Sequence, residues 1–211
     1  MKLDDAEIDR QHCIAIVHEY QRCRDSFTLF ESAATQLIMG GKNRLMSYRA
    51  YNAYASFILH LYEFLVALHA RDLNVTEITK TNTEEKHERL DKLIHSSISR
   101  VVRNRIDRIE QGTAPRWEND LSTYQALWPV SPNFASEFRR MRNKVGGHVT
   151  YQRAKEIDLT AFYQANHSYL YMLYRDCGDW WAPRGDAFPE LDQITDFFGS
   201  IVRELHPDAH K

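Results

Sequence analysis

Glycine and proline are scarce in this chain, and their positions limit how long its regular segments can be. Only 8 glycines and 6 prolines occur in 211 residues. Most of them cluster at residues 40–41, 112–115, 129–132, 146–147 and 178–189. Because both residue types interrupt helices, the stretches between these clusters are free to form long ones.

Apolar residues recur between the clusters at the three- and four-residue spacing of an amphipathic helix, as at Leu90, Ile94, Ile98 and Val102. No alternating stretch bounded by turn residues indicates a strand. The sequence therefore predicts an all-α fold, an antiparallel bundle of about five to seven helices. The length suits a single domain over 1–211, with a core at about 5–176 and a C-terminal loop and last helix at 177–211.

Capping signals set the expected ends of the helices. The box Thr81-x-x-Glu84 is typical of a helix start. Ser131 is expected to cap a helix that begins at Pro132, and Gly178 is expected to follow the end of another. The expected helices span residues 5–39, 44–71, about 81–109, 115–126, 132–145, 159–176 and 189–205.

The composition excludes several functional classes. Lys plus Arg is 27 and Asp plus Glu is 29, so a net charge of −2 argues against a polycationic binder of nucleic acid or membranes. Three cysteines without a short paired spacing favour neither a disulfide framework nor a cysteine zinc site. The acidic N-terminus resembles no targeting peptide, and polar residues interrupt the apolar run from Ala53 to Leu68. We therefore expect a cytoplasmic protein without membrane contact, metal or cofactor.

The most informative string is FRRMRNKVGGH at residues 138–148. On a helical wheel Phe138, Met141 and Val145 share an apolar face, and Arg142 lies about 40° from Phe138, at its edge. An arginine at that edge is well placed to bind a phosphate. The glycine pair then ends the helix and allows the chain to bring His148 back toward the same edge.

This string resembles the signature of the HEPN superfamily, small helical domains that are often metal-independent ribonucleases of toxin and phage-defence systems. The signature is an arginine, a polar residue and a histidine four to six residues beyond. Arg142, Asn143 and His148 match it with five residues between Arg and His, and the abortive-infection type is the most similar. The resemblance implies a homodimer with a shared cleft, an RNA substrate, and an antitoxin or defence partner protein.

Spacing alone does not single out this pair, because two other Arg–His pairs occur at comparable separations. Arg89 and His95 fall within one expected helix, about 240° apart, and cannot converge on one ligand. The tail pair that ends at His210 straddles Pro207. Only the Arg142 pair combines an asparagine, an edge position and helix-ending glycines.

Phosphate chemistry suggests a role for each member of the pair. His148 is suited to take the proton from a ribose 2′-oxygen, and Arg142 to stabilise the charge that develops on phosphorus. The products would be a 2′,3′-cyclic phosphate and a free 5′-hydroxyl. Asn143 is expected either to orient the histidine or to contact the RNA backbone. Some HEPN toxins carry a tyrosine two residues after the histidine, but here Thr150 holds that place and Tyr151 follows, which argues against a modifying antitoxin.

Other polar residues allow two interpretations each. In the second helix a polar arc of about 80° either lines a cleft opposite Arg142 or is the solvent face. Its members are Arg49, Asn52, Ser56, His60 and Glu63. Four arginines between residues 100 and 108 either track RNA or form ion pairs with Asp107 and Glu110.

Two further features, in the last part of the sequence, are also open. Trp180 and Trp181 are expected to pin a loop to the core or to stack on bases. His206 and His210 have metal-binding spacing, but Pro207 opposes the helix that it needs. The main alternative function is a non-catalytic helical module that binds a protein, a nucleotide or RNA, in which the Arg-Asn string is structural.

Overall fold

A computed structural model describes residues 3–78, 83–118, 120–146, 158–186 and 201. These residues form six α-helices and one short 3₁₀ helix, and they contain no strand, which confirms the predicted all-α bundle. The elements are α1 (Ala6–Gly40), α2 (Arg44–Asp72), α3 (Thr83–Glu110), η1 (Arg116–Glu118), α4 (Leu121–Gln125), α5 (Phe134–Gly146) and α7 (Leu159–Asp186).

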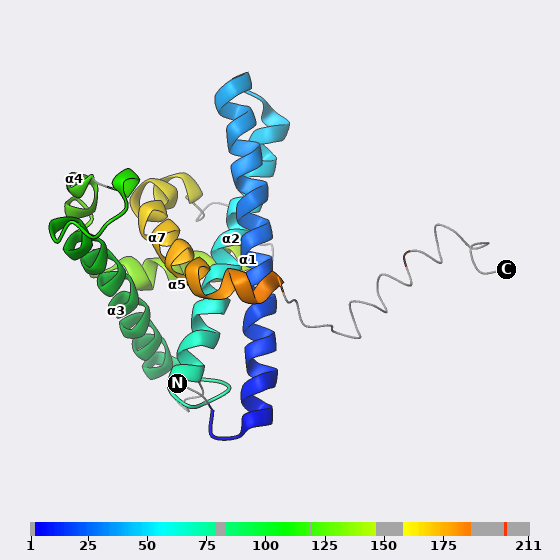
Figure 1. Cartoon of the computed structure of the whole chain (residues 1–211). Helices are drawn as coiled ribbons and strands as arrows, with labels where there is room; N and C mark the ends of the chain where they lie inside the picture. The colour runs from blue at the N-terminus through cyan, green and yellow to red at the C-terminus, as the bar shows by residue number, and fades with distance from the viewer. Residues whose placement is uncertain (1–2, 79–82, 119, 147–157, 187–200, 202–211) are drawn as a thin grey trace.

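The two longest helices, α1 and α2, form an antiparallel hairpin and lie side by side (Figure 1). The side chain of Asp5 caps α1 by accepting hydrogen bonds from the backbone N–H groups of Glu7 and Ile8. Gly41 adopts a positive φ of 74°, and its N–H closes the helix on the carbonyl of Leu37. The predicted break at the glycine pair is therefore confirmed, and it sets the turn of the hairpin.

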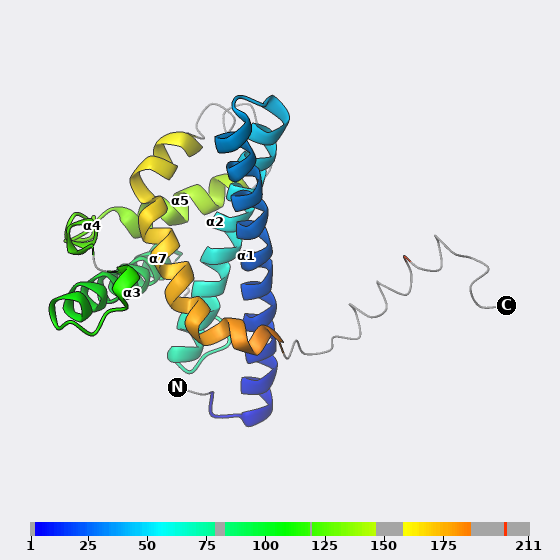
Figure 2. The ribbon, with the colours of Figure 1, turned by 45° about the horizontal axis from the view of Figure 1, so that its top comes forward.

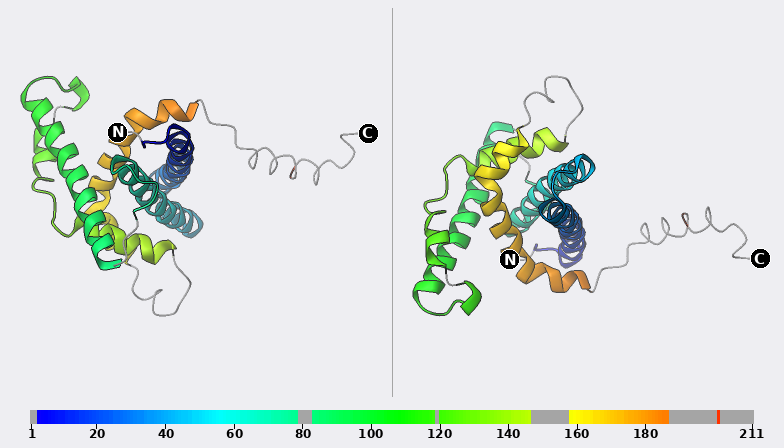
Figure 3. Two further views of the ribbon diagram at one scale, coloured as in Figure 1. Left: turned by 90° about the horizontal axis from the view of Figure 1, so that it is seen from below. Right: turned by 90° about the horizontal axis from the view of Figure 1, so that it is seen from above.

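The core is centred on α2, which contacts α1, α3, α5 and α7. Figure 3 shows α3 on one side of the molecule and the hairpin on the other, with α7 between them. Aromatic rings fill much of the interior: Phe27 of α1 lies 4.9 Å from Phe57 of α2 and 4.7 Å from Tyr174 of α7, measured between ring centroids. This packing joins three helices that are distant in sequence.

The helix starts between α3 and α5 differ from the expected ones. The structure describes α3 from Thr83, so Thr81 lies outside the described residues. The expected helix 115–126 is replaced by η1 and the five-residue α4. Helix α5 begins at Phe134, and Ser131 does not cap it. The carbonyl of Ser131 instead accepts a hydrogen bond from the N–H of Phe134, across a turn that contains Pro132.

Gly178 does not end a helix, contrary to the sequence prediction, because α7 continues through it to Asp186. The last part of α7 bends and lies across α1 (Figure 2). A Cβ atom at Gly178 would lie 2.9 Å from the hydroxyl oxygen of Tyr20, so this glycine allows α7 to approach α1 closely. Trp180 and Trp181 are helical. Trp181 packs on the core, edge-on to Phe64, and Trp180 is largely exposed.

Of the expected last helix, 189–205, only Ile201 is described.

Helix α2 also bears on the membrane prediction. Among the described residues it is the one helix that is long and apolar enough, by length and composition, to cross a membrane. From the sequence alone, the apolar run of this segment is expected to be too interrupted for a membrane span. A helix packed in the core of a protein meets the same criterion, and α2 contacts four other helices here.

Replacing Gly178 by alanine is expected to destabilise the protein by about 1–3 kcal/mol, because the new methyl group would press on the buried Tyr20. The Tyr20 ring is buried and packs against Phe64 and Tyr174, so it has little freedom to move. Gly40→Ala is the matched control: open space surrounds that helical position, and alanine there should be neutral or stabilising by up to about 1 kcal/mol. Urea denaturation measures both variants.

A double variant checks the physical cause. Tyr20→Phe removes the oxygen that a Cβ at position 178 would meet, so Gly178→Ala should cost less in that background than in the wild type. Equal costs in the two backgrounds would show that the close approach to Tyr20 is not the reason for the glycine.

The free energy of unfolding should fall as the pH is lowered through the ordinary histidine range. Burial lowers the pKa values of His69 and His167, so both take up protons at a lower pH in the folded protein than in the unfolded chain. In the unfolded chain they take up protons below about pH 6.5, which stabilises the unfolded state on acidification. His167→Gln should therefore reduce the difference in unfolding free energy between pH 7.5 and about pH 5.5. An unchanged difference would contradict this assignment.

Candidate active site at the edge between α2 and α5

Helix α5 presents its predicted apolar face to the core. Phe134, Phe138 and Met141 are buried, and Phe138 packs edge-on against Tyr62 of α2 with ring centroids 5.2 Å apart. The helical wheel drawn from the sequence was therefore correct for this segment. It follows that Arg142 sits at the edge of the buried stripe, with its side chain 33% exposed.

Three neighbours hold the Arg142 guanidinium in place. Its Nη2 donates to Oε1 of Glu63 on α2, and its Nη1 donates to Oδ1 of Asn143 at 3.0 Å. The guanidinium carbon lies 5.7 Å from the centre of the Tyr62 ring, within the range of a cation–π interaction. Nε is buried and has no acceptor among the described residues. The cation is thus oriented while part of its hydrogen-bonding capacity remains unused.

A second arginine of α5 serves as a comparison. Arg139 forms a two-bond pair with Asp91 of α3, with both N–O distances 2.9 Å. Both side chains are 19% exposed, and the hydrogen-bonded carboxylate raises the pKa of Arg139. Helix α5 is therefore fixed to α3 by the more buried pair and to α2 by the more exposed one.

The C-terminal end of α5 lies close to α2. A Cβ atom at Gly146 would lie 3.1 Å from Cδ1 of Leu59, so the helix ends against α2 about one turn after Arg142. His148 and Tyr151, two residues of the predicted site, lie outside the described residues, as does Thr150. Whether Arg142 and His148 converge remains a prediction.

The polar arc of α2 does not form one cleft opposite Arg142. Only Glu63 reaches the arginine, whereas His60, one turn earlier, faces α1 and its Nδ1 lies 2.7 Å from Oε1 of Glu19. Because α2 is enclosed by different helices along its length, one polar arc meets different partners. Neither the single-cleft interpretation nor the plain solvent-face interpretation describes it fully.

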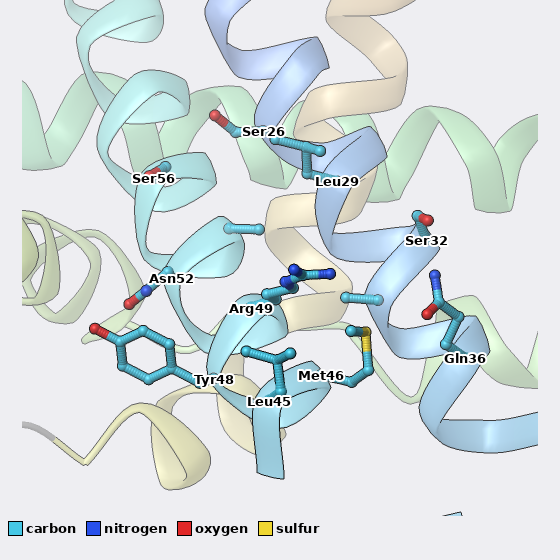
Figure 4. Close-up of a pocket in the computed structure, with 12 residues that line it drawn as sticks. Ser26, Leu29, Ser32, Gln36, Leu45, Met46, Tyr48, Arg49, Asn52 and Ser56 are labelled. Atoms are coloured by element: carbon cyan, nitrogen blue, oxygen red, sulfur yellow. The ribbon is translucent and has the colours of Figure 1, made fainter. Parts of the chain in front are cut away.

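Asn52 lies on a separate cavity of about 640 Å³ between α1 and α2 (Figure 4). Arg49 and Ser56 of the same arc line it, together with apolar side chains such as Leu29 and Leu45. Asn52 and His60, predicted to support the site, are therefore not brought to Arg142.

The arginines of α3 pair differently from the sequence expectation. Arg105 binds Glu118 of η1 at 2.6 Å, Arg100 lies 4.0 Å from Asp176 of α7, and Arg103 stacks on Trp128 at 4.7 Å. None of these partners is Asp107 or Glu110. The expectation failed because partners from other elements lie closer to these side chains than their neighbours along the helix.

The sequence also gave no reason to include Tyr62, which contributes its ring face to Arg142. It adjoins Glu63 in the chain, but on a helix adjacent residues point about 100° apart, so no spacing rule links them. Only the packing of α5 across α2 brings both side chains to the same guanidinium.

Metal ligands are not grouped in the described part of the chain, which contains no cluster of three or more His, Cys, Asp or Glu side chains suited to an ion. Cys13, Cys23 and Cys177 are not joined by disulfides. His206 and His210 lie outside the described residues.

No protein-family model matches the chain, and comparisons with curated proteins and with solved structures give no match.

The two ion pairs of α5 differ in exposure, so removing Arg139 and removing Arg142 should lower the free energy of unfolding by different amounts. Arg139→Gln should destabilise the protein by about 2 kcal/mol, because it leaves the mostly buried Asp91 carboxylate unpaired. Arg142→Gln should cost about 1 kcal/mol or less, because water reaches its more exposed pair. Urea denaturation of the two variants tests this order, and a larger loss for Arg142→Gln would identify its pair as the main structural tie.

Proposed function

We propose that this chain is a metal-independent endoribonuclease of the HEPN type, with Arg142 and His148 as its catalytic pair. The observation that carries the proposal is the Arg142 guanidinium, held at the surface edge between α2 and α5 by Glu63, Asn143 and the Tyr62 ring. A preorganised, partly exposed cation is what stabilisation of a phosphorane requires.

Chain length supports the pairing with His148. Arg142 lies about 6 Å along the helix axis from Gly146, at 1.5 Å per residue. His148 follows Gly146 by two residues, so its Cα is within about 7.6 Å of the Gly146 Cα whatever path the chain takes. The connection is therefore short enough to allow the His148 side chain to reach a phosphate bound to Arg142.

In the reaction, His148 removes the proton from a ribose 2′-hydroxyl, and the 2′-oxygen attacks the adjacent phosphorus. The bond from phosphorus to the 5′-oxygen breaks, and the leaving oxygen takes up a proton. Arg142 has five N–H bonds, of which two are given to Glu63 and Asn143 and one, on Nε, is buried, so the second N–H of each Nη is left for the phosphate oxygens. Glu63 and Asn143 act as positioning residues in this scheme.

The biological setting belongs to the same proposal. A toxin or phage-defence ribonuclease of the abortive-infection type would act in the cytoplasm, as a homodimer, with an antitoxin or another defence protein as its partner. Tyr151 is then a candidate substrate contact close to His148 in sequence.

One observation favours the alternative, a non-catalytic interaction module. Helix α5 is joined to its neighbours by two arginine–carboxylate pairs, Arg142 with Glu63 and Arg139 with Asp91, and the first pair resembles the second. If Arg142 only fastens α5, its removal affects stability and leaves any cleavage unchanged.

Cleavage of single-stranded RNA in the presence of EDTA tests the proposal. We expect Arg142→Gln and His148→Asn each to lower the rate by about 100-fold or more, since each removes a transition-state contact. Arg140→Gln is the matched control, because this exposed arginine of α5 lies on the cavity between α5 and α7, away from Glu63. The product ends should carry a 2′,3′-cyclic phosphate and a 5′-hydroxyl.

Cleavage at the wild-type rate by both folded variants would remove these residues from the mechanism. Failure of the wild-type protein to cleave a varied set of RNAs would favour the interaction module.

A further inference from the structure

A second cavity, of about 500 Å³, lies among α3, η1, α4 and α7 and shares no residue with the surroundings of Arg142. Figure 1 shows α3 and α4 on the side of the molecule away from the hairpin, with α7 running between them and α1. The charged and aromatic residues that line it are Arg105, Glu118, Tyr124, His167, Tyr171 and Arg175. Cavities of this size commonly hold small ligands.

The charges that line this cavity do not cancel. Glu118 is a buried carboxylate, 6% exposed, shared by two guanidinium groups. Arg105 binds it at 2.6 Å and is itself mostly buried, whereas Arg175 lies at 3.5 Å and is 40% exposed. One carboxylate neutralises one of the two cations, so a single positive charge is left, and it resides mainly on the looser, more accessible Arg175.

The neighbouring acids are engaged mainly with groups other than Arg175. Asp120 caps α4 and accepts hydrogen bonds from Ser122 and Thr123. Asp176 lies 4.0 Å from Arg100 of α3 and also interacts electrostatically with the buried Arg105. Neither carboxylate lines the cavity.

Flat rings surround the accessible cation. The Arg175 guanidinium lies 5.4 Å from the Trp117 ring and 5.9 Å from the Tyr171 ring. His167 stacks on Tyr171 with an interplanar angle of 25°, and burial lowers its pKa, so this ring is neutral at physiological pH. Tyr124 adds a further ring to the lining. The cavity therefore offers aromatic faces beside one unbalanced cation.

We propose that this cavity binds an aromatic ring that carries a phosphate, namely a nucleoside monophosphate unit, either free or within an RNA strand. The ring would stack on the Tyr171 side of the cavity, and the phosphate would bind Arg175, whose planar guanidinium suits phosphate oxygens. Glu118, fixed by Arg105, would accept a hydrogen bond from an amino group of the base. This proposal does not depend on ribonuclease activity at Arg142.

Calorimetric titration of the full chain with AMP, adenosine and inorganic phosphate tests the two parts of the proposal separately. AMP should bind about tenfold more tightly than adenosine, because only AMP uses the charge of Arg175, and phosphate alone should bind weakest. Arg175→Gln should weaken AMP about tenfold and leave adenosine unchanged. Tyr171→Leu, which removes the ring but keeps an apolar side chain at this partly exposed position, should weaken both.

The matched control is Arg22→Gln on α1, an exposed arginine outside the cavity, which should bind AMP as the wild type does. Arg142→Gln should also bind AMP normally, so that loss of RNA cleavage and loss of nucleotide binding remain distinguishable. Absence of AMP binding by the folded wild-type protein would overturn the proposal, as would AMP affinity unaffected by both Arg175→Gln and Tyr171→Leu.

A 5′-phosphorylated oligoadenylate of eight nucleotides distinguishes the two sources of the ligand. Binding at least tenfold tighter than AMP, and still weakened by Arg175→Gln, would identify an RNA strand. Affinity equal to that of AMP or lower would identify the free nucleotide.

Discussion

Enclosure of α2 by four other helices is the constraint on which the rest of this structure depends. Its rings meet Phe27 of α1 and Tyr174 of α7 through Phe57, and Phe138 of α5 through Tyr62. A helix enclosed in this way keeps few places for charged side chains, because burying an unpaired charge is costly. His60 and Glu63 are tolerated because each meets a partner from a different helix. The position of the candidate site is thus a consequence of core packing.

Patterns confined to one element could be predicted from the sequence. The hairpin turn at Gly41, the buried face of α5 and the edge position of Arg142 all follow from spacing along a single helix or turn. Gly178 could not be interpreted in that way. A glycine near a helix end usually indicates a stop, but here it makes room for Tyr20 of another helix, which only tertiary packing reveals.

The same limit applies to the charged residues. The arc on α2 correctly included Glu63, yet the sequence could not separate it from Asn52, which lies on another cavity. The predicted partners of the α3 arginines were their neighbours along the helix, whereas Glu118 comes from a different element and is more deeply buried. Pairing between elements depends on the relative placement of helices, which periodicity does not contain.

Exposure separates the arginines that hold the fold together from those that can bind a ligand. Arg139 and Arg105 are mostly buried and each forms a short bond to a carboxylate, so exchanging that carboxylate for a phosphate would leave a buried acid unpaired. Arg142 and Arg175 are about twice as exposed. Water can reach Glu63 if Arg142 releases it, and Glu118 keeps its bond to Arg105 if Arg175 releases it. Each of these two also lies beside an aromatic ring that keeps the guanidinium in place when its partners change. The two proposed sites therefore share one physical basis. Each contains a guanidinium that the fold orients, and in each the guanidinium can exchange its carboxylate partner for a phosphate.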